Sequence, residues 1–312
     1  MNHRQLWKKI FGDNDAYIDF YFKERADHTV VYSKYEGHDL VSMIFFNYYT
    51  LVIRGEKVKC PYIEGVATAP EWRVHTGYDL IFNPSETLFM KKVRENGGKA
   101  YNGLKMLLYQ GMMDARNEGA PYAFLSPANE EIYKPFGFQG VYYRKQMEIQ
   151  GRRHKWYHAG SFSHLDSRLK ERAVEFVNAQ LYASELDVYI YRDVKYYDTL
   201  MKETKTLGGK VVVLRNETMI DGVAVVTHEE DRYEVQEMIC APEDADKVVE
   251  SLCYYLGVTD DETVLFEDGY FLQNVTGEGI AVRMTEKPYI MARALGDDGD
   301  AGNLKWYIND IT

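Results

Sequence analysis

Cysteine is scarce in this sequence: the 312 residues include three, Cys60, Cys240 and Cys253. An odd, scattered set forms neither a disulfide framework nor a paired-cysteine metal site, so we expect a reducing compartment, the cytoplasm. The eight histidines show no HxxH or HExxH spacing, so we expect no metal site. No uncharged run reaches the roughly 18 residues that cross a bilayer, so we expect no membrane partner.

Positive charge is also in the minority. Lysine and arginine total 37 against 48 aspartates and glutamates, which gives a net charge of −11. Such a balance argues against nucleic acid as a partner and suits cationic small substrates. Hydrophobic residues make up 46% of the chain, which excludes wholesale disorder, and the length predicts two domains.

The first half alternates between helical and strand-like patterns. Apolar residues recur at helical spacing in Leu6–Phe22 and in Gly103–Asn117. The runs typical of strands are His28–Ser33, Leu40–Tyr49, Tyr62–Thr68, Tyr122–Ser126 and Tyr142–Ile149. This order predicts an α/β domain over residues 1–150, with a mixed sheet and one long helix on its face.

The second half repeats this coarse plan after a basic, aromatic segment, Gly151–His158, which we interpret as a linker. We predict a second domain over residues 151–295, related to the first by duplication. The remaining residues, 296–312, form a tail in which an acidic, glycine-rich part, Gly296–Asn303, is expected to be flexible. The end of the tail is apolar, which favours docking.

Three segments carry a resemblance to a known family: GVATAPEWR (Gly65–Arg73), GKAYNGLKMLL (Gly98–Leu108) and FLSPANEEIYKPFGF (Phe124–Phe138). Together they resemble the GNAT superfamily of N-acetyltransferases, in particular its enhanced-intracellular-survival-type branch. The resemblance implies an α/β fold of two tandem GNAT-like domains, each a mixed, mostly antiparallel sheet flanked by helices. The tail would then dock into the active site of the first domain.

Acetyl-CoA is the cosubstrate that this resemblance implies. A strand that parts from its neighbour can offer backbone groups to the pantetheine arm, and a loop that opens a helix can offer N–H groups to the pyrophosphate. Val66, Ala67 and Thr68 would form the strand. The loop would be formed by Arg73, Gly98, Lys99, Ala100 and Tyr101.

One departure from the family pattern is the insertion of Val74–Gly97 between the two parts of this loop. Two placements of the phosphate-binding motif therefore stay open: Arg73 joined to Gly98–Tyr101, or the local sequence Arg94-x-x-Gly97. We prefer the first, because Gly98–Leu108 keeps the family's spacing into the helix. The insertion could be a lid, a partner contact or a disabling change.

The resemblance also assigns catalytic roles. The tyrosine of its I-Y-x-x-F-G-F motif, here Tyr133, protonates the leaving thiolate. A C-terminal carboxylate, here that of Thr312, accepts the proton of the amine. From its place in the strand before Gly65, Glu64 could assist this deprotonation through water.

The sequence thus predicts a cytoplasmic N-acetyltransferase that moves an acetyl group from acetyl-CoA to a primary, cationic amine by direct attack. The substrate would be a small molecule or a lysine side chain, and a homo-oligomer stays open. The alternative is a non-catalytic acyl-CoA-binding or scaffold module whose cofactor loop is disrupted by residues 74–97.

Overall fold

The computed structural model describes residues 1–72, 100–229, 232–296 and 299–309. Its contacts divide the chain into two compact units. Unit 1 comprises Met1–Leu51, Lys57–Val141 and Pro288–Leu304. Unit 2 comprises Val52–Glu56, Tyr142–Lys287 and Lys305–Thr312.

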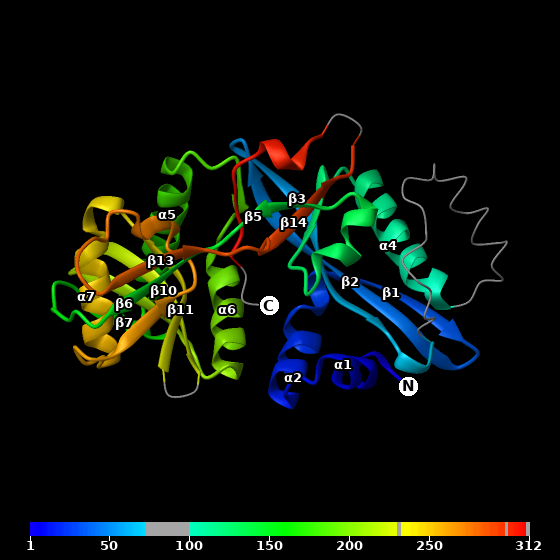
Figure 1. The fold of residues 1–312 in the computed structure, drawn as a ribbon, viewed down its shortest axis with the longest axis horizontal. Helices are drawn as coiled ribbons and strands as arrows, with labels where there is room; N and C mark the ends of the chain where they lie inside the picture. Colours follow the sequence, from blue (N-terminus) through cyan, green and yellow to red (C-terminus); the bar gives the residue numbers. More distant parts are fainter. Residues whose placement is uncertain (73–99, 230–231, 297–298, 310–312) are drawn as a thin grey trace. The chain divides into compact units, whose positions relative to one another are not determined.

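Unit 1 is built around one mixed sheet. Its helices and strands are α1 (His3–Phe11), α2 (Asp15–Glu24), β1 (Thr29–Glu36), β2 (Asp39–Ile53), β3 (Glu56–Thr68), α4 (Ala100–Asn117), β4 (Tyr122–Leu125), β5 (Gln139–Tyr142) and β14 (Ile290–Ala294). The strand order is β2-β3-β4-β14-β5, and β1 pairs with β2 (Figure 1). The pairs β1–β2 and β4–β14 are antiparallel, whereas β3 and β4 are parallel.

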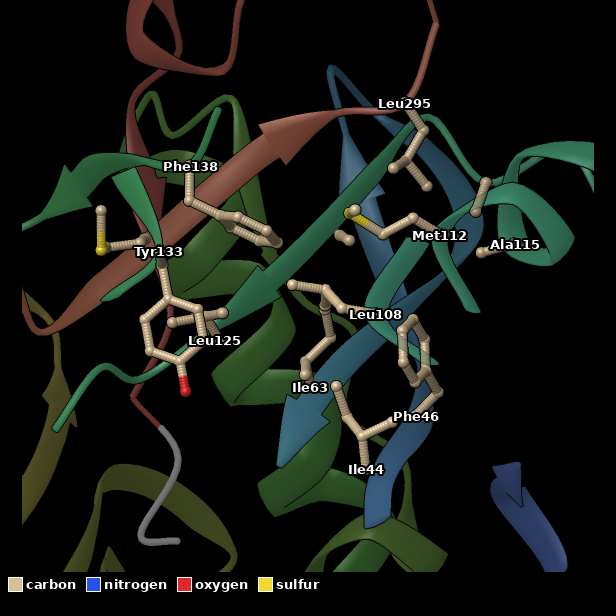
Figure 2. Packing of buried hydrophobic residues seen from close by; sticks show 13 residues of the cluster. Ile44, Phe46, Ile63, Leu108, Met112, Ala115, Leu125, Tyr133, Phe138 and Leu295 are labelled. Atoms are coloured by element: carbon tan, nitrogen blue, oxygen red, sulfur yellow. The ribbon is translucent and has the colours of Figure 1, made fainter. Parts of the chain in front are cut away.

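Helices cover both faces of this sheet. Because successive strand residues point to opposite faces, Ile44 and Phe46 pack with Leu108 and Met112 of α4 (Figure 2). The alternate residues of β2, Met43 and Phe45, pack in a second cluster with α1 and α2. The sheet of unit 1 therefore lies between α4 and the α1–α2 pair.

The two N-terminal helices follow local sequence signals. The side chain of Asn2 caps α1 by accepting a hydrogen bond from the N–H of Gln5, and the side-chain oxygen of Gln5 accepts one from the N–H of Asn2. Gly12 ends α1 in the left-handed conformation at φ 75°, where glycine carries no steric cost. Asn14 then caps α2 through the N–H of Tyr17.

Unit 2 contains a second mixed sheet. Its helices and strands are β6 (Lys145–Gln150), β7 (His158–Ser161), α5 (Ser167–Ala183), β8 (Val188–Ile190), α6 (Val194–Thr206), β9 (Lys210–Asn216), β10 (Met219–Glu229), β11 (Arg232–Cys240), α7 (Ala245–Leu256), β12 (Thr263–Phe266), β13 (Ile280–Met284) and β15 (Trp306–Tyr307). The strand order is β13-β6-β12-β11-β10-β9-β7, and β15 pairs in parallel with β8. The pair β11–β12 is parallel, whereas β10–β11, β9–β10, β6–β12, β6–β13 and β7–β9 are antiparallel.

The predicted fold class is confirmed: the chain is an α/β protein with two mixed sheets flanked by helices. One predicted strand is wrong, because Tyr142–Ile149 is divided between β5 and β6. The backbone of Arg144 bonds to Thr285 instead, and its side chain is buried beside Glu267.

The C-terminal quarter also differs from expectation. Residues Pro288–Leu304, whose first part was assigned to the second domain, lie in unit 1, where β14 pairs with β4. The expected flexible stretch contains a short 3-10 helix, Ala301–Asn303, in which Ala301 is fully buried and Asp300 caps Gly302. The exact division into residues 1–150, 151–295 and 296–312 stays a prediction.

Candidate active site

The parallel strands β3 and β4 of unit 1 part soon after they meet. Among the described residues they pair at one position, Tyr62 with Phe124, although β3 continues for six more residues to Thr68. We call this arrangement the β3–β4 fork. Beyond the fork, β3 is not paired with β4 in the described structure. The backbone N–H and C=O groups on that edge of β3 can therefore hydrogen-bond to a ligand.

Gly65 lies in β3 just beyond the fork, and the side chains that follow it point to other faces of the sheet than a regular strand would give. Its φ of +59° is a left-handed conformation that L side chains rarely adopt. Before it, Ile63 packs with the α4 cluster; after it, Val66 packs there and Ala67 packs with the α1–α2 cluster. Residues 63 and 67 would share a face in a regular strand, so Gly65 introduces a bulge.

The residues predicted to bind the cofactor are placed as follows. Val66 is partly buried, Ala67 is buried, and the hydroxyl of Thr68 lies 3.0 Å from that of Ser42. Ala100 begins α4, and Tyr101 follows it. Arg73, Gly98 and Lys99 lie outside the described residues, as does the insertion 74–97.

Tyr133 lies between two short 3-10 helices, Glu130–Ile132 and Lys134–Phe136. Its carbonyl accepts hydrogen bonds from Phe136 and Phe138, and Gly137 closes the turn at φ 78°. These bonds fix the backbone on both sides of the tyrosine. The turn predicted from the motif is therefore present, with Phe138 anchored in the core.

The side chain of Tyr133 is 9% exposed and belongs to the α4 cluster. Its ring lies 6.1 Å from that of Phe138, and Figure 2 shows its hydroxyl pointing away from Phe138, Leu108 and Met112. Burial raises the pKa of Tyr133 to about 12. The phenol therefore keeps its proton at neutral pH, and within the described part of the chain that hydroxyl has no hydrogen-bond partner.

A polar network surrounds Glu64 on the α1–α2 face of the sheet. The amide of Asn47, which is 3% exposed, donates to Glu64 Oε2 at 2.7 Å. The hydroxyl of Tyr17 lies 3.5 Å from the other carboxylate oxygen, and that of Tyr21 hydrogen-bonds to Asn47. Burial and the charge of Glu64 raise the pKa of Tyr21 well above its usual value, so Tyr21 stays a neutral donor.

Sequence reasoning missed Tyr21, Asn47 and Gly65 as parts of this site. Asn47 is the signal that could have been used, because it is a polar residue within the apolar run of β2. Thr312 lies outside the described residues, so its predicted role stays a prediction.

Metal sites and membrane-spanning helices are two further classes of feature. Among the described residues, no group of three or more histidine, cysteine, aspartate or glutamate side chains could hold a metal ion. Within the same residues, no helix is both long and apolar enough to cross a membrane.

Known proteins share parts of this sequence. Residues 2–79 match the family model of the acetyltransferase (GNAT) domain. A stretch of 64 residues is 45% identical to the shikimate dehydrogenase (NADP(+)) of Caldanaerobacter subterraneus subsp. tengcongensis and covers 20% of each chain. The chain thus spans about a fifth of that curated relative, and a match this short transfers no dehydrogenase activity.

Solved structures share the fold over nearly the whole chain. A "Probable N-Acyltransferase" from Enterococcus faecalis V583 has a TM-score of 0.67 at 14% identity, covering 94% of this chain and 69% of its own. Eis1 from Mycobacterium abscessus has a TM-score of 0.56 at 13% identity, covering 94% and 70%. Residues 2–79 are therefore similar to the acetyltransferase (GNAT) domain, and the chain has the fold of the GNAT N-acetyltransferases, as its motifs predict.

Proposed function

We propose that the chain transfers an acetyl group from acetyl-CoA to a primary amine, and that unit 1 carries the site. The observation that supports this most is the β3–β4 fork together with Tyr133, which follows β4 by eight residues. A parted parallel pair gives the acyl donor an unpaired strand, and Tyr133 adds a neutral hydroxyl held by a fixed turn.

The donor would lie along β3 beyond Tyr62. There the backbone of Val66 and Ala67 would hydrogen-bond the amides of the pantetheine arm, as a neighbouring strand does. The pyrophosphate would be held by the start of α4, where Ala100 and Tyr101 lie, since helix N-termini attract anions. Arg73, Gly98 and Lys99 are proposed to complete that contact.

The transfer forms a C–N bond between the amine and the thioester carbonyl carbon and breaks the C–S bond. Tyr133 has a pKa of about 12, above the roughly 8.5 of a thiol. It therefore stabilises the developing thiolate by donating a hydrogen bond, and the proton released by the amine ultimately neutralises the sulfur. Glu64, oriented by Asn47, is placed to accept that proton directly or through water; the carboxylate of Thr312 is the second candidate.

A cationic amine is the substrate class that we propose, because the chain has a net charge of −11 and a carboxylate lies in the site. Both a small molecule and a lysine side chain satisfy this chemistry. Cys60, Cys240 and Cys253 are free and buried, which supports a reducing compartment such as the cytoplasm.

The test is an amine screen with a free-thiol readout, followed by Tyr133→Phe. Loss of one hydrogen bond to the developing thiolate should lower kcat about 100-fold, while acetyl-CoA affinity, measured by calorimetry, stays unchanged. Tyr32→Phe is the matched control, because it removes a tyrosine hydroxyl beside the same α4 cluster that is already bonded to Asp114 of α4. A chain that binds acetyl-CoA without turnover on any amine would refute the transferase and favour an acyl-CoA-binding module.

A further inference from the structure

The two units share a parallel strand pair in the same topological position. In unit 2 the pairing of β11 with β12 consists of Glu234 with Leu265 and Val235 with Phe266. Like β3 in unit 1, β11 continues after the pairing ends, here to Cys240. We call this the β11–β12 fork. Aligning Val235 with Tyr62 places Glu237 at the position of Glu64, two residues past the last pair in each unit.

The carboxylate of Glu237 is buried and already hydrogen-bonded within unit 2. It is 4% exposed and accepts two hydrogen bonds from the guanidinium of Arg192, which is 1% exposed. A third bond comes from the hydroxyl of Tyr307 at 2.9 Å. The charge of the Glu237 carboxylate is therefore compensated by Arg192, and its hydrogen-bonding capacity is met by Arg192 and Tyr307, all within unit 2.

The segment Lys305–Asn309 supplies that third donor and is itself buried. Trp306 and Tyr307 pair in parallel with Val188 and Tyr189 of β8. Backbone bonds from Asp187 and Val188 to the carbonyl of Lys305 begin the pairing. The side chains of Trp306, Tyr307, Ile308 and Asn309 are each 5% exposed or less.

Two side chains of this segment make specific contacts. The ring of Tyr307 lies 5.3–5.5 Å from those of Tyr142, Tyr270 and Phe271. The amide of Asn309 donates to the carbonyl of Gln236 at 2.6 Å and accepts a hydrogen bond from Arg144. Gln236 is the first residue of β11 beyond the pairing with β12. Asn309 therefore hydrogen-bonds to a backbone carbonyl of the β11–β12 fork.

The start of α7 gives an independent argument that this fork receives no acyl donor. In unit 2 the helix between the two forked strands is preceded by Glu243 and Asp244 and carries Asp246 in its first turn. Three carboxylates at a helix N-terminus disfavour a pyrophosphate, although Lys247 pairs with Asp244 and Arg152 pairs with Asp246. The corresponding loop of unit 1 carries Gly98 and Lys99 in the sequence instead.

We propose that the β11–β12 fork is a peptide-binding site that Lys305–Asn309 occupies in cis, in the place that the acyl donor takes in unit 1. The ligand class is an extended segment with an aromatic residue that bonds to Glu237 and, two residues later, an asparagine that bonds to Gln236. The comparison with the donor rests on the proposed function. The peptide site itself rests on the contacts of unit 2.

Hydrogen exchange of the full chain, read by mass spectrometry, tests both parts. Acetyl-CoA should protect Ile63–Ala67 and leave Val235–Glu237 and Trp306–Ile308 unchanged. Tyr307→Phe with Asn309→Ala should speed exchange in Trp306–Ile308 about tenfold or more, because bonds to a charged group and to a buried carbonyl are lost. Tyr270→Phe is the matched control: it removes a hydroxyl from the same ring cluster that bonds to Ser184 instead of Glu237, and exchange in the segment should stay within about twofold of wild type.

A peptide supplied in trans completes the test. A labelled acetyl-Lys-Trp-Tyr-Ile-Asn-amide should bind the folded Tyr307→Ala/Asn309→Ala chain and not the wild type. Equal binding to both chains, no binding to the folded variant, or unchanged exchange in the milder variant would overturn the proposal. Protection of Val235–Glu237 by acetyl-CoA would overturn it too, while leaving the transferase intact. If acetyl-CoA protects neither unit, the proposed function fails and the peptide arms still decide the site.

Discussion

Asp268 is a buried acid whose ionisation should make the stability of the protein depend on pH. It is 1% exposed, accepts a hydrogen bond from the hydroxyl of Tyr142, and accepts another from the N–H of Tyr270. Burial raises the pKa of Asp268 to about 7, against the lowering effects of these bonds and of Arg144; the charge of Glu237 adds to the rise.

The sign of the effect follows from proton linkage. An acid whose pKa is higher in the folded state than in the unfolded state stabilises the fold fully when the pH is below its unfolded-state pKa. This stabilisation is lost as the pH rises through its folded-state pKa. The ordinary pKa of an aspartate is 3.8 and that of Asp268 is about 7, a difference that corresponds to about 4 kcal/mol in total. Between pH 5 and pH 8 the loss should be about 3 kcal/mol.

Asp268→Asn should remove this dependence, because the amide resembles the neutral acid at every pH. Urea unfolding followed by fluorescence at pH 5 and pH 8 gives the free energy of unfolding of each variant. The wild type should lose about 3 kcal/mol more than the variant over this interval. Asp260→Asn, at a carboxylate 76% exposed, is the control and should behave like the wild type. An equal decline in Asp268→Asn and wild type would refute the reasoning.

Three further changes test the geometry. Gly65→Ala should lower the free energy of unfolding, measured in urea, by about 3 kcal/mol. At this position a Cβ would have a φ of +59° and would lie 2.6 Å from both Phe45 and Trp7. Gly37→Ala is the control: its φ is +62° but the space around it is open, so it should cost about 1 kcal/mol. Arg192→Met should lower stability by about 3–5 kcal/mol, since it leaves Glu237 charged and buried, whereas Arg192→Lys should cost less. The pH profile of kcat should show no alkaline loss below about pH 11, because Tyr133 keeps its proton up to a pKa of about 12; an inflection near pH 9 that disappears in Tyr133→Phe would contradict this.

Local signals were sufficient to predict the turn around Tyr133. Asn129, Pro135 and Gly137 act within a few residues, through a cap, a fixed φ and a left-handed C-cap, so their effect is readable from the sequence. The helix α4 and the strands β2 and β3 were predictable for the same reason, although β3 begins six residues earlier than expected, at Glu56.

The network around Glu64 was not predictable in this way. Asn47 and Tyr21 reach Glu64 from a different strand and a helix, and the hydrogen bonds depend on which face each residue takes. These faces depend on how β2 and β3 are paired, and one residue of shift in that register would turn Glu64 to the other side of the sheet. A sequence pattern with period two carries no record of such a shift.

The completion of the sheet in unit 1 depends on contacts distant in sequence. All four residues of β4 are buried, yet among the described residues β4 pairs with β3 at a single position. Its remaining backbone groups would lack partners in the core, at a cost of several kcal/mol, if β14 did not pair with it from Met291 to Ala294. The fork therefore exists because β4 is held on its other side by a strand that follows it by more than 160 residues. The motif in Phe124–Phe138 specifies the turn that carries Tyr133. The strand that precedes this turn, β4, is instead positioned by β14 near the C-terminal end of the chain.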